Sequence, residues 1–170
     1  LAVNEFTADN EFGIEPGIYG IPLDVTTIQM VYNKSLYEKA GLDPSKPPRT
    51  WEEFIGHASI LKEAGIPRFV GGFGEIWMLD ALASNLAMNL MGEEKVFDTY
   101  RKVLSYVDSG YPNRDWNLSI AMVMEGKAAM ALAGDWALGE FNVAGKKANV
   151  DYVCANGPGT QGQFVWLADY

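Results

Sequence analysis

The sequence predicts an α/β fold. Short apolar or β-branched stretches, which are typical of strands, occur at residues 26–32, 69–73, 128–133 and 150–154. Stretches with one apolar face at helical spacing lie between them. Such alternation is typical of a sheet covered by helices on both faces, and we expect this sheet to be mixed. With 170 residues and 48% hydrophobic composition, the chain can bury the core of one domain.

Several helix ends are marked in the sequence. Thr50 and Glu53 have the spacing of a capping box, in which each side chain satisfies a free backbone N–H of the other residue. Gly41 is expected to end a short helix at 33–40. Further helices are expected at 75–90, 96–107 and 115–125. In the last of these the inward residues are expected to be Leu118, Ala121 and Met122.

The stretch from Gly126 to Trp136 combines a strand and a junction. A buried strand at 128–133 ends at Gly134, and Asp135 is expected to cap the next helix with Trp136 at its first position. Ligands of open α/β sheets bind at the carboxyl ends of strands. A carboxylate beside a flat aromatic ring suits a sugar. On these residues alone, a capped helix with a core tryptophan remains the simpler interpretation.

A second junction repeats this pattern. The strand at 69–73 runs into glycines, and Glu75 and Trp77 follow at the start of a helix. A core aromatic ring and an acidic residue that complements the helix dipole would also explain the pair. The glycines lack the spacing and the lysine of a phosphate-binding loop.

Composition excludes several function classes. The formal charge of −9 argues against nucleic acid and anionic membranes as partners, and no apolar run is long enough to span a bilayer. No signal peptide is visible at the beginning of the chain. The single cysteine, Cys154, is interpreted as a core thiol, and His57 has no serine or cysteine motif beside it. We therefore expect no cofactor, no metal site and no catalytic residues.

An ordered series of short motifs resembles a known family. It comprises YGIPLD at 19–24, YNK at 32–34, AGL at 40–42, PRTWEEF at 48–54, GKAAM at 126–130, GDW at 134–136 and PGTQG at 158–162. From Tyr19 onward the chain is similar to extracellular solute-binding proteins of bacterial sugar ABC transporters. The resemblance is to the glucose/mannose-type branch of the maltose-binding-like group.

The resemblance implies a periplasmic-binding-protein-like (type II) fold, in which two α/β lobes close on a sugar. Residues 18–170 match only the second lobe, after an irregular lead-in at 1–17, so the chain is expected to be a fragment whose partner includes the missing first lobe. The implied function is capture of a mono- or small oligosaccharide, glucose-type first, and its delivery to ABC permease subunits. The implied location is extracytoplasmic, either in the periplasm or at the cell surface as a lipoprotein.

The family's ligand-binding positions map onto this chain. Asp24 matches a hinge-side acidic residue, Glu75 and Trp77 match an acidic–aromatic pair, and Trp136 matches a stacking ring with Asp135 beside it. Two alternatives stay open. Glu75 and Asp135 could be the acid/base pair of a glycoside hydrolase-like lobe. The chain could also be a non-catalytic lobe that only docks on another protein.

Overall fold

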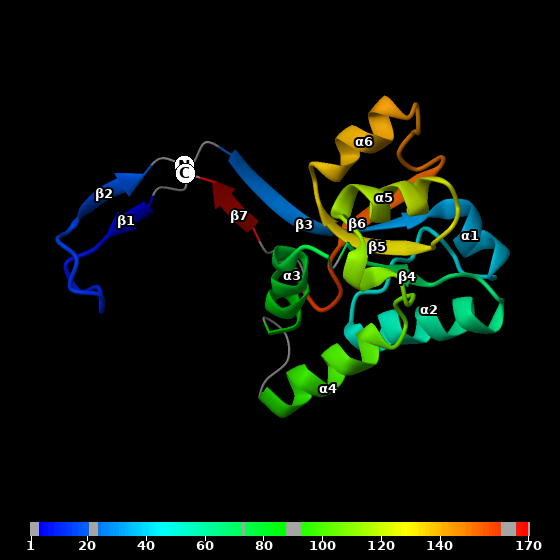
Figure 1. The fold of residues 1–170 in the computed structure, drawn as a ribbon, viewed down its shortest axis with the longest axis horizontal. Coiled ribbons are helices and arrows are strands. Elements are labelled where there is room, and N and C mark those ends of the chain that lie inside the picture. The colour runs from blue at the N-terminus through cyan, green and yellow to red at the C-terminus, as the bar shows by residue number, and fades with distance from the viewer. Residues whose placement is uncertain (1–3, 21–23, 73, 88–92, 161–165, 170) are drawn as a thin grey trace.

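The computed structural model describes residues 4–20, 24–72, 74–87, 93–160 and 166–169. The chain alternates between strands and helices, as the sequence predicts (Figure 1). The strands are β1 (Asn4–Phe6), β2 (Gly17–Gly20), β3 (Asp24–Asn33), β4 (Phe69–Val70), β5 (Met130–Gly134), β6 (Tyr152–Asn156) and β7 (Trp166–Asp169). The helices are α1 (Lys34–Lys39), α2 (Trp51–Glu63), α3 (Ile76–Ala87), α4 (Glu93–Leu104), α5 (Trp116–Met124) and α6 (Ala137–Val143).

A mixed sheet forms the centre of the fold. Its strand order is β4-β5-β3-β6, and β7 pairs with the first part of β3. Strands β4 and β5 are parallel, whereas β3 runs antiparallel to β5, β6 and β7. The long strand β3 therefore carries β7 along residues 24–27 and β6 along residues 29–33. The predicted mixed sheet is confirmed.

Helices cover both faces of this sheet. Helices α1 to α4 pack on one face and α5 and α6 on the other, and the layers are visible in Figure 1. Because strand side chains alternate between faces, β3 sends Met30 into the first core and Val31 into the second, and both are fully buried. The predicted packing of helices on both faces is therefore confirmed.

The local signals at helix ends form as expected. The Glu53 N–H donates to Thr50 Oγ1 at 3.1 Å, and the Thr50 N–H donates to Glu53 Oε2 at 3.3 Å. This capping box starts α2. Gly41 and Gly126 have φ values of +78° and +69° and follow the ends of α1 and α5, where the left-handed backbone favours glycine.

The predicted inward face of α5 is wrong. The buried residues of this helix are Ser119, Ile120 and Val123, whereas Leu118 is 54% exposed. Residues 118–124 are apolar almost all round the helix. Periodicity alone therefore could not choose the face that packs on β5 and α6.

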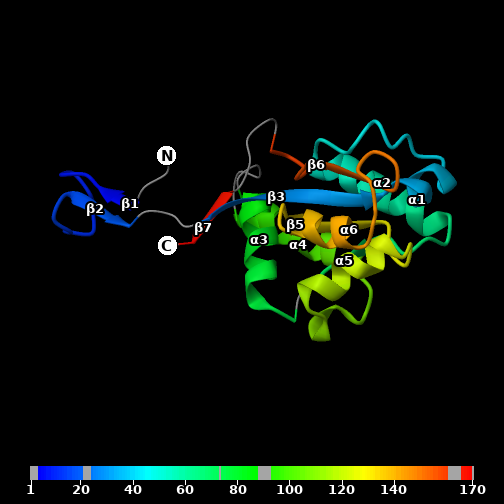
Figure 2. The same cartoon turned by 90° about the horizontal axis from the view of Figure 1, so that it is seen from above.

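Residues 4–6 form a strand within the segment 1–17, where the sequence predicts an irregular lead-in. Strand β1 pairs with β2 in a separate two-stranded sheet, which lies apart from the main layers (Figures 1 and 2). The Phe6 ring contacts Phe12 and Tyr19 edge-on, at centroid distances of 6.1 and 5.6 Å. Phe12, Ile18 and Tyr19 are nevertheless largely exposed. None of the described helices is both long and apolar enough to cross a bilayer.

Candidate functional site

The two junctions singled out in the sequence meet at one end of the sheet. Because β4 and β5 are parallel neighbours, the segments that follow them start at the same edge. Trp77, in the first turn of α3, and Trp136, directly before α6, lie there with ring centroids 5.5 Å apart and planes tilted by 59°. Both rings are half-buried. Side chains 59 residues apart in the sequence thus form one aromatic surface.

Gly134 determines how Trp136 lies. The Trp136 indole folds back over the last residue of β5. A Cβ at Gly134 would stand only 1.6 Å from Trp136 Cζ3 and 2.0 Å from Cε3. Real Cβ atoms do not approach other atoms so closely. Besides ending the strand, this glycine leaves the space that the indole occupies.

A third tryptophan, which the sequence motifs do not single out, belongs to the same surface. Trp116, the first residue of α5, lies perpendicular to Trp136 with ring centroids 6.2 Å apart. A signal existed, because Asp115-Trp116 repeats the acidic–tryptophan pair of Asp135-Trp136 at the start of a helix. No predicted strand directly precedes this pair, so the sequence pattern indicates only the start of a helix there.

Glu75 holds two elements together. Its Oε2 accepts a hydrogen bond from the backbone N–H of Trp116 at 3.1 Å, so the carboxylate satisfies one of the free donors of α5. The backbone near Glu75 also lies close to the start of α5, because a Cβ at Gly72 would lie 2.4 Å from Trp116 Cα. The Gly74 N–H donates to the Arg114 carbonyl at 3.0 Å. The junction after β4 is therefore fixed directly against the start of α5.

An ion pair between Arg114 and Asp108, whose side chains are 9% and 37% exposed, supports this junction. As a whole residue Arg114 is 7% exposed, and its guanidinium donates hydrogen bonds to both carboxylate oxygens of Asp108. Its Nη1 lies 2.7 Å from Asp108 Oδ2. The same nitrogen donates to the Gly71 carbonyl at 3.4 Å. The hydrogen bonds from Arg114 hold the pKa of Asp108 below its usual range. The pair fixes the loop that leads into Trp116.

Asp135 has a different role from the predicted helix cap. Trp136, not Asp135, occupies the N-cap position of α6, and it makes no side-chain capping bond. Asp135 instead faces β3: its Oδ2 accepts from Thr27 Oγ1 at 3.4 Å, and its backbone N–H donates to the Thr27 carbonyl at 3.0 Å. Gln29 Nε2 donates to the same hydroxyl at 3.0 Å. Because the backbone pairing with β3 continues one residue beyond the end of β5, α6 begins later than predicted.

Asp24 lies on the same strand as Thr27. It is the first residue of β3 and pairs with Asp169 of β7. Thr27 is three residues further along the strand, roughly 10 Å away from Asp24. The structure describes the backbone of Asp24 but not its side chain. Glu75, Trp77, Asp135 and Trp136 are thus brought to one end of the sheet, and Asp24 is placed only by its strand.

This arrangement combines half-buried aromatic rings with carboxylate oxygens. Aromatic faces pack against apolar surface, and carboxylates accept hydrogen bonds from hydroxyl groups. Among the described residues, no group of His, Cys, Asp or Glu side chains is placed to hold a metal ion.

Comparison with known proteins places the chain in a family. Residues 1–168 match the sequence profile of the bacterial extracellular solute-binding proteins. The chain belongs to this family. It is 38% identical to a probable sugar-binding periplasmic protein of Rhizobium meliloti (strain 1021), over 87% of this chain and 40% of that protein. The chain therefore spans about 40% of the length of that curated relative.

Solved structures of the family have the same fold. A chitin oligosaccharide binding protein superimposes with a TM-score of 0.71 and 25% identity, over 94% of this chain and 45% of that one. BlMnBP1 of Bifidobacterium animalis subsp. lactis ATCC27673, a binding protein of an ABC transporter in complex with mannotriose, gives a TM-score of 0.71 and 23% identity. That match covers 92% of this chain and 44% of BlMnBP1. The type II periplasmic-binding-protein-like fold expected from the sequence is confirmed.

Proposed function

We propose that this chain supplies one wall of the sugar site in a solute-binding protein of an ABC importer. The observation that carries the proposal is the cluster of Trp77, Trp116 and Trp136 at the carboxyl ends of β4 and β5, with Glu75 and Asp135 beside it. The proposal includes an extracytoplasmic location and delivery of the sugar to permease subunits. The name of the Rhizobium relative supports the location. The name of a relative from Pyrococcus horikoshii, an ABC transporter extracellular-binding protein that is 31% identical over 79% of this chain, supports the delivery.

Each kind of side chain has a separate task in this proposal. The apolar C–H face of a sugar ring stacks on Trp136, whose orientation Gly134 permits. Asp135 and Glu75 accept hydrogen bonds from sugar hydroxyls. They use the carboxylate lone pairs that are not engaged by Thr27 and Trp116. Asp24 remains a candidate on the hinge side. Glucose-type sugars are the first ligands to test, and the named neighbours extend the set to chitin and manno-oligosaccharides.

We also propose that this site binds without catalysis. Glu75 holds the backbone of α5 and Asp135 is tied to β3, so both carboxylates already have structural partners. A glycosidase needs one carboxyl group that protonates the leaving group and a second one that attacks or activates water. We expect no cleavage of any oligosaccharide that binds. Turnover that disappears in Glu75→Gln would contradict this expectation.

The test is a titration with glucose, mannose, mannotriose and chitotriose, followed by tryptophan fluorescence and by calorimetry. We expect Trp136→Ala to weaken binding by about tenfold or more, because it removes the stacking surface. Trp51→Phe is the control, since Trp51 is buried in the α2 core and its loss should leave the sugar-induced fluorescence change intact. Unchanged affinity of Trp136→Ala for every sugar that binds would overturn the proposal.

A further inference from the structure

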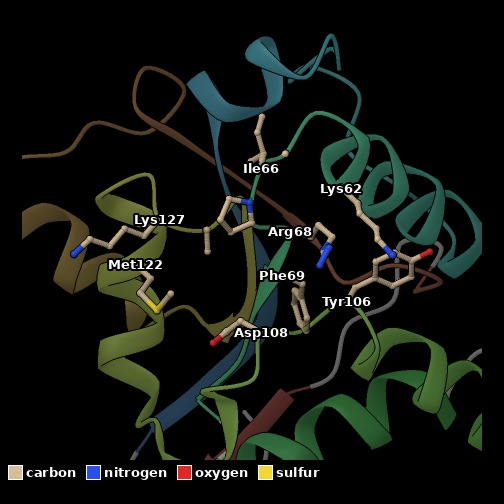
Figure 3. A pocket seen from close by; sticks show the side chains of 11 residues that line it. Lys62, Ile66, Arg68, Phe69, Tyr106, Asp108, Met122 and Lys127 are labelled. Atoms are coloured by element: carbon tan, nitrogen blue, oxygen red, sulfur yellow. The ribbon is translucent and has the colours of Figure 1, made fainter.

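A hollow lies at the end of the parallel strands β4 and β5 that is opposite to the tryptophan surface. The tryptophans follow β4 and β5, whereas this hollow is lined by residues that precede them, including Arg68 and Lys127 (Figure 3). Its volume is about 310 Å³, and Lys62 and Tyr106 complete the part considered below. Nothing in the proposed sugar site uses these residues.

Arg68 has no counterion among the described residues that line this hollow. Its Nε atom is buried and has no hydrogen-bond partner among the residues that the structure describes. Its guanidinium carbon lies 6.0 Å from the centroid of the Tyr106 ring. Within the same described ranges, no carboxylate forms an ion pair with Arg68 or with Lys62. Buried polar groups normally have partners, so an unpaired buried donor indicates an absent acceptor.

The other charges that line the hollow are already occupied. Asp108 accepts both hydrogen bonds from Arg114, so it does not neutralise Arg68. The amino group of Lys127 lies 2.6 Å from Glu125 Oε2, and Lys127 extends away from Arg68 in Figure 3. Arg68 and Lys62 therefore leave a local positive charge on a chain whose net charge is −9.

We propose that this hollow binds a small organic carboxylate, with Arg68 as the principal anchor and Lys62 as a second charge. The planar fork of a guanidinium matches the two oxygens of a carboxylate, and the Tyr106 ring, whose centroid is 6.0 Å from the guanidinium carbon, lines the same hollow. Ile66 and Phe69 are buried in the wall and give the carbon part of the ligand an apolar surface. The net negative charge of the chain disfavours anions of higher charge.

The carboxylate can come from a free acid or from an acidic side chain of a docking protein. Both present the same group to Arg68. This site stands apart from the sugar site, so its presence or absence does not depend on the function proposed above.

The test is an NMR titration of the 170-residue chain with sodium propionate, against sodium chloride at equal ionic strength. We expect saturable shifts of the Arg68 Nε–H and of the Phe69 and Tyr106 amides. Arg68→Gln should weaken binding about tenfold, the loss expected for one charge-assisted hydrogen bond. Arg68→Lys keeps the positive charge but lacks the planar fork, so it should weaken propionate binding several-fold. This variant also tests the site if the glutamine variant misfolds.

Lys127→Gln is the matched control, because it removes one positive charge from the same hollow at a residue already paired with Glu125. Its affinity for propionate should stay within about twofold of the unmodified chain. Equal losses in Arg68→Gln and Lys127→Gln would overturn the proposal, as would the absence of saturable shifts. Tighter binding of inorganic phosphate than of propionate would also contradict it. A blocked glutamate peptide that binds more tightly than propionate identifies a protein side chain as the source, and equal binding identifies a free acid.

Discussion

At the scale of single residues, glycines set the geometry of the tryptophan surface. Gly134 leaves room for the Trp136 indole, and Gly72 lets the chain after β4 approach the backbone of Trp116. Neither residue has a positive φ, so space rather than backbone conformation requires glycine at both positions. The acidic side chains then hold the surrounding backbone, Glu75 at α5 and Asp135 at β3.

Gly134→Ala should therefore displace Trp136. The added Cβ would occupy the position of the indole, so we expect a loss of about 1–3 kcal/mol in the free energy of unfolding, as for other overpacked sites. Tryptophan emission should shift to longer wavelength and sugar affinity should fall with it. Gly139→Ala in α6 is the control, because its Cβ would meet nothing within 4 Å. An unchanged emission maximum in Gly134→Ala would show that the indole does not lie over this glycine.

At the scale of elements, an ion pair connects the loop before α5 to the strand end of β4. Arg114 joins Asp108 to the Gly71 carbonyl, and the neighbouring Glu75–Trp116 bond joins the start of α3 to α5. Asp108 has a lowered pKa because it accepts hydrogen bonds from Arg114 in the folded state. The stabilisation that this carboxylate provides therefore depends on pH.

The sign of that dependence follows from the lowered pKa. The contribution of Asp108 is present above the ordinary aspartate pKa of about 3.9 and is lost as the pH falls through the lower pKa of the folded state. Asp108→Asn should reduce stability at pH 6 and flatten its decline as the pH falls below about 4. Urea unfolding over this range measures the effect. Asp98→Asn, which disrupts the exposed Asp98–Arg101 pair, should change both quantities little. Parallel pH profiles of Asp108→Asn and the unmodified chain would contradict the prediction.

At the scale of the whole molecule, the two ends of the sheet carry different surfaces. The tryptophans lie at the carboxyl ends of β4 and β5, and the Arg68 hollow lies at their amino ends. Strands β3 and β7 continue beyond the helical layers towards the β1–β2 pair (Figures 1 and 2). Since the chain spans 40% of the Rhizobium relative, we propose that its tryptophan surface forms only part of the whole protein's sugar site.

The isolated chain should consequently bind sugar weakly. One wall leaves the second face of the sugar in water, so stacking and a few hydrogen bonds must offset an association cost of about 4 kcal/mol or more. We expect dissociation constants on the order of 1 mM or weaker. Calorimetry on a sample shown to be monomeric by light scattering measures this. Micromolar affinity for any mono- or disaccharide in such a sample would show that one wall is enough.

The sequence by itself determined the α/β class, the capping box of α2, the glycine helix ends and four residues of the candidate site that the fold brings together. These features depend on local periodicity, on neighbouring residues and on family motifs, all of which are present in the linear chain. Only the tertiary structure decided which face of α5 is buried, because an all-round apolar helix has no preferred side until β5 and α6 pack against it. It also decided that Asp135 bonds to Thr27, that Trp116 joins the aromatic surface and that Arg68 has no counterion among the residues that the structure describes. Each of these depends on contacts between residues distant in the chain, which no local pattern encodes.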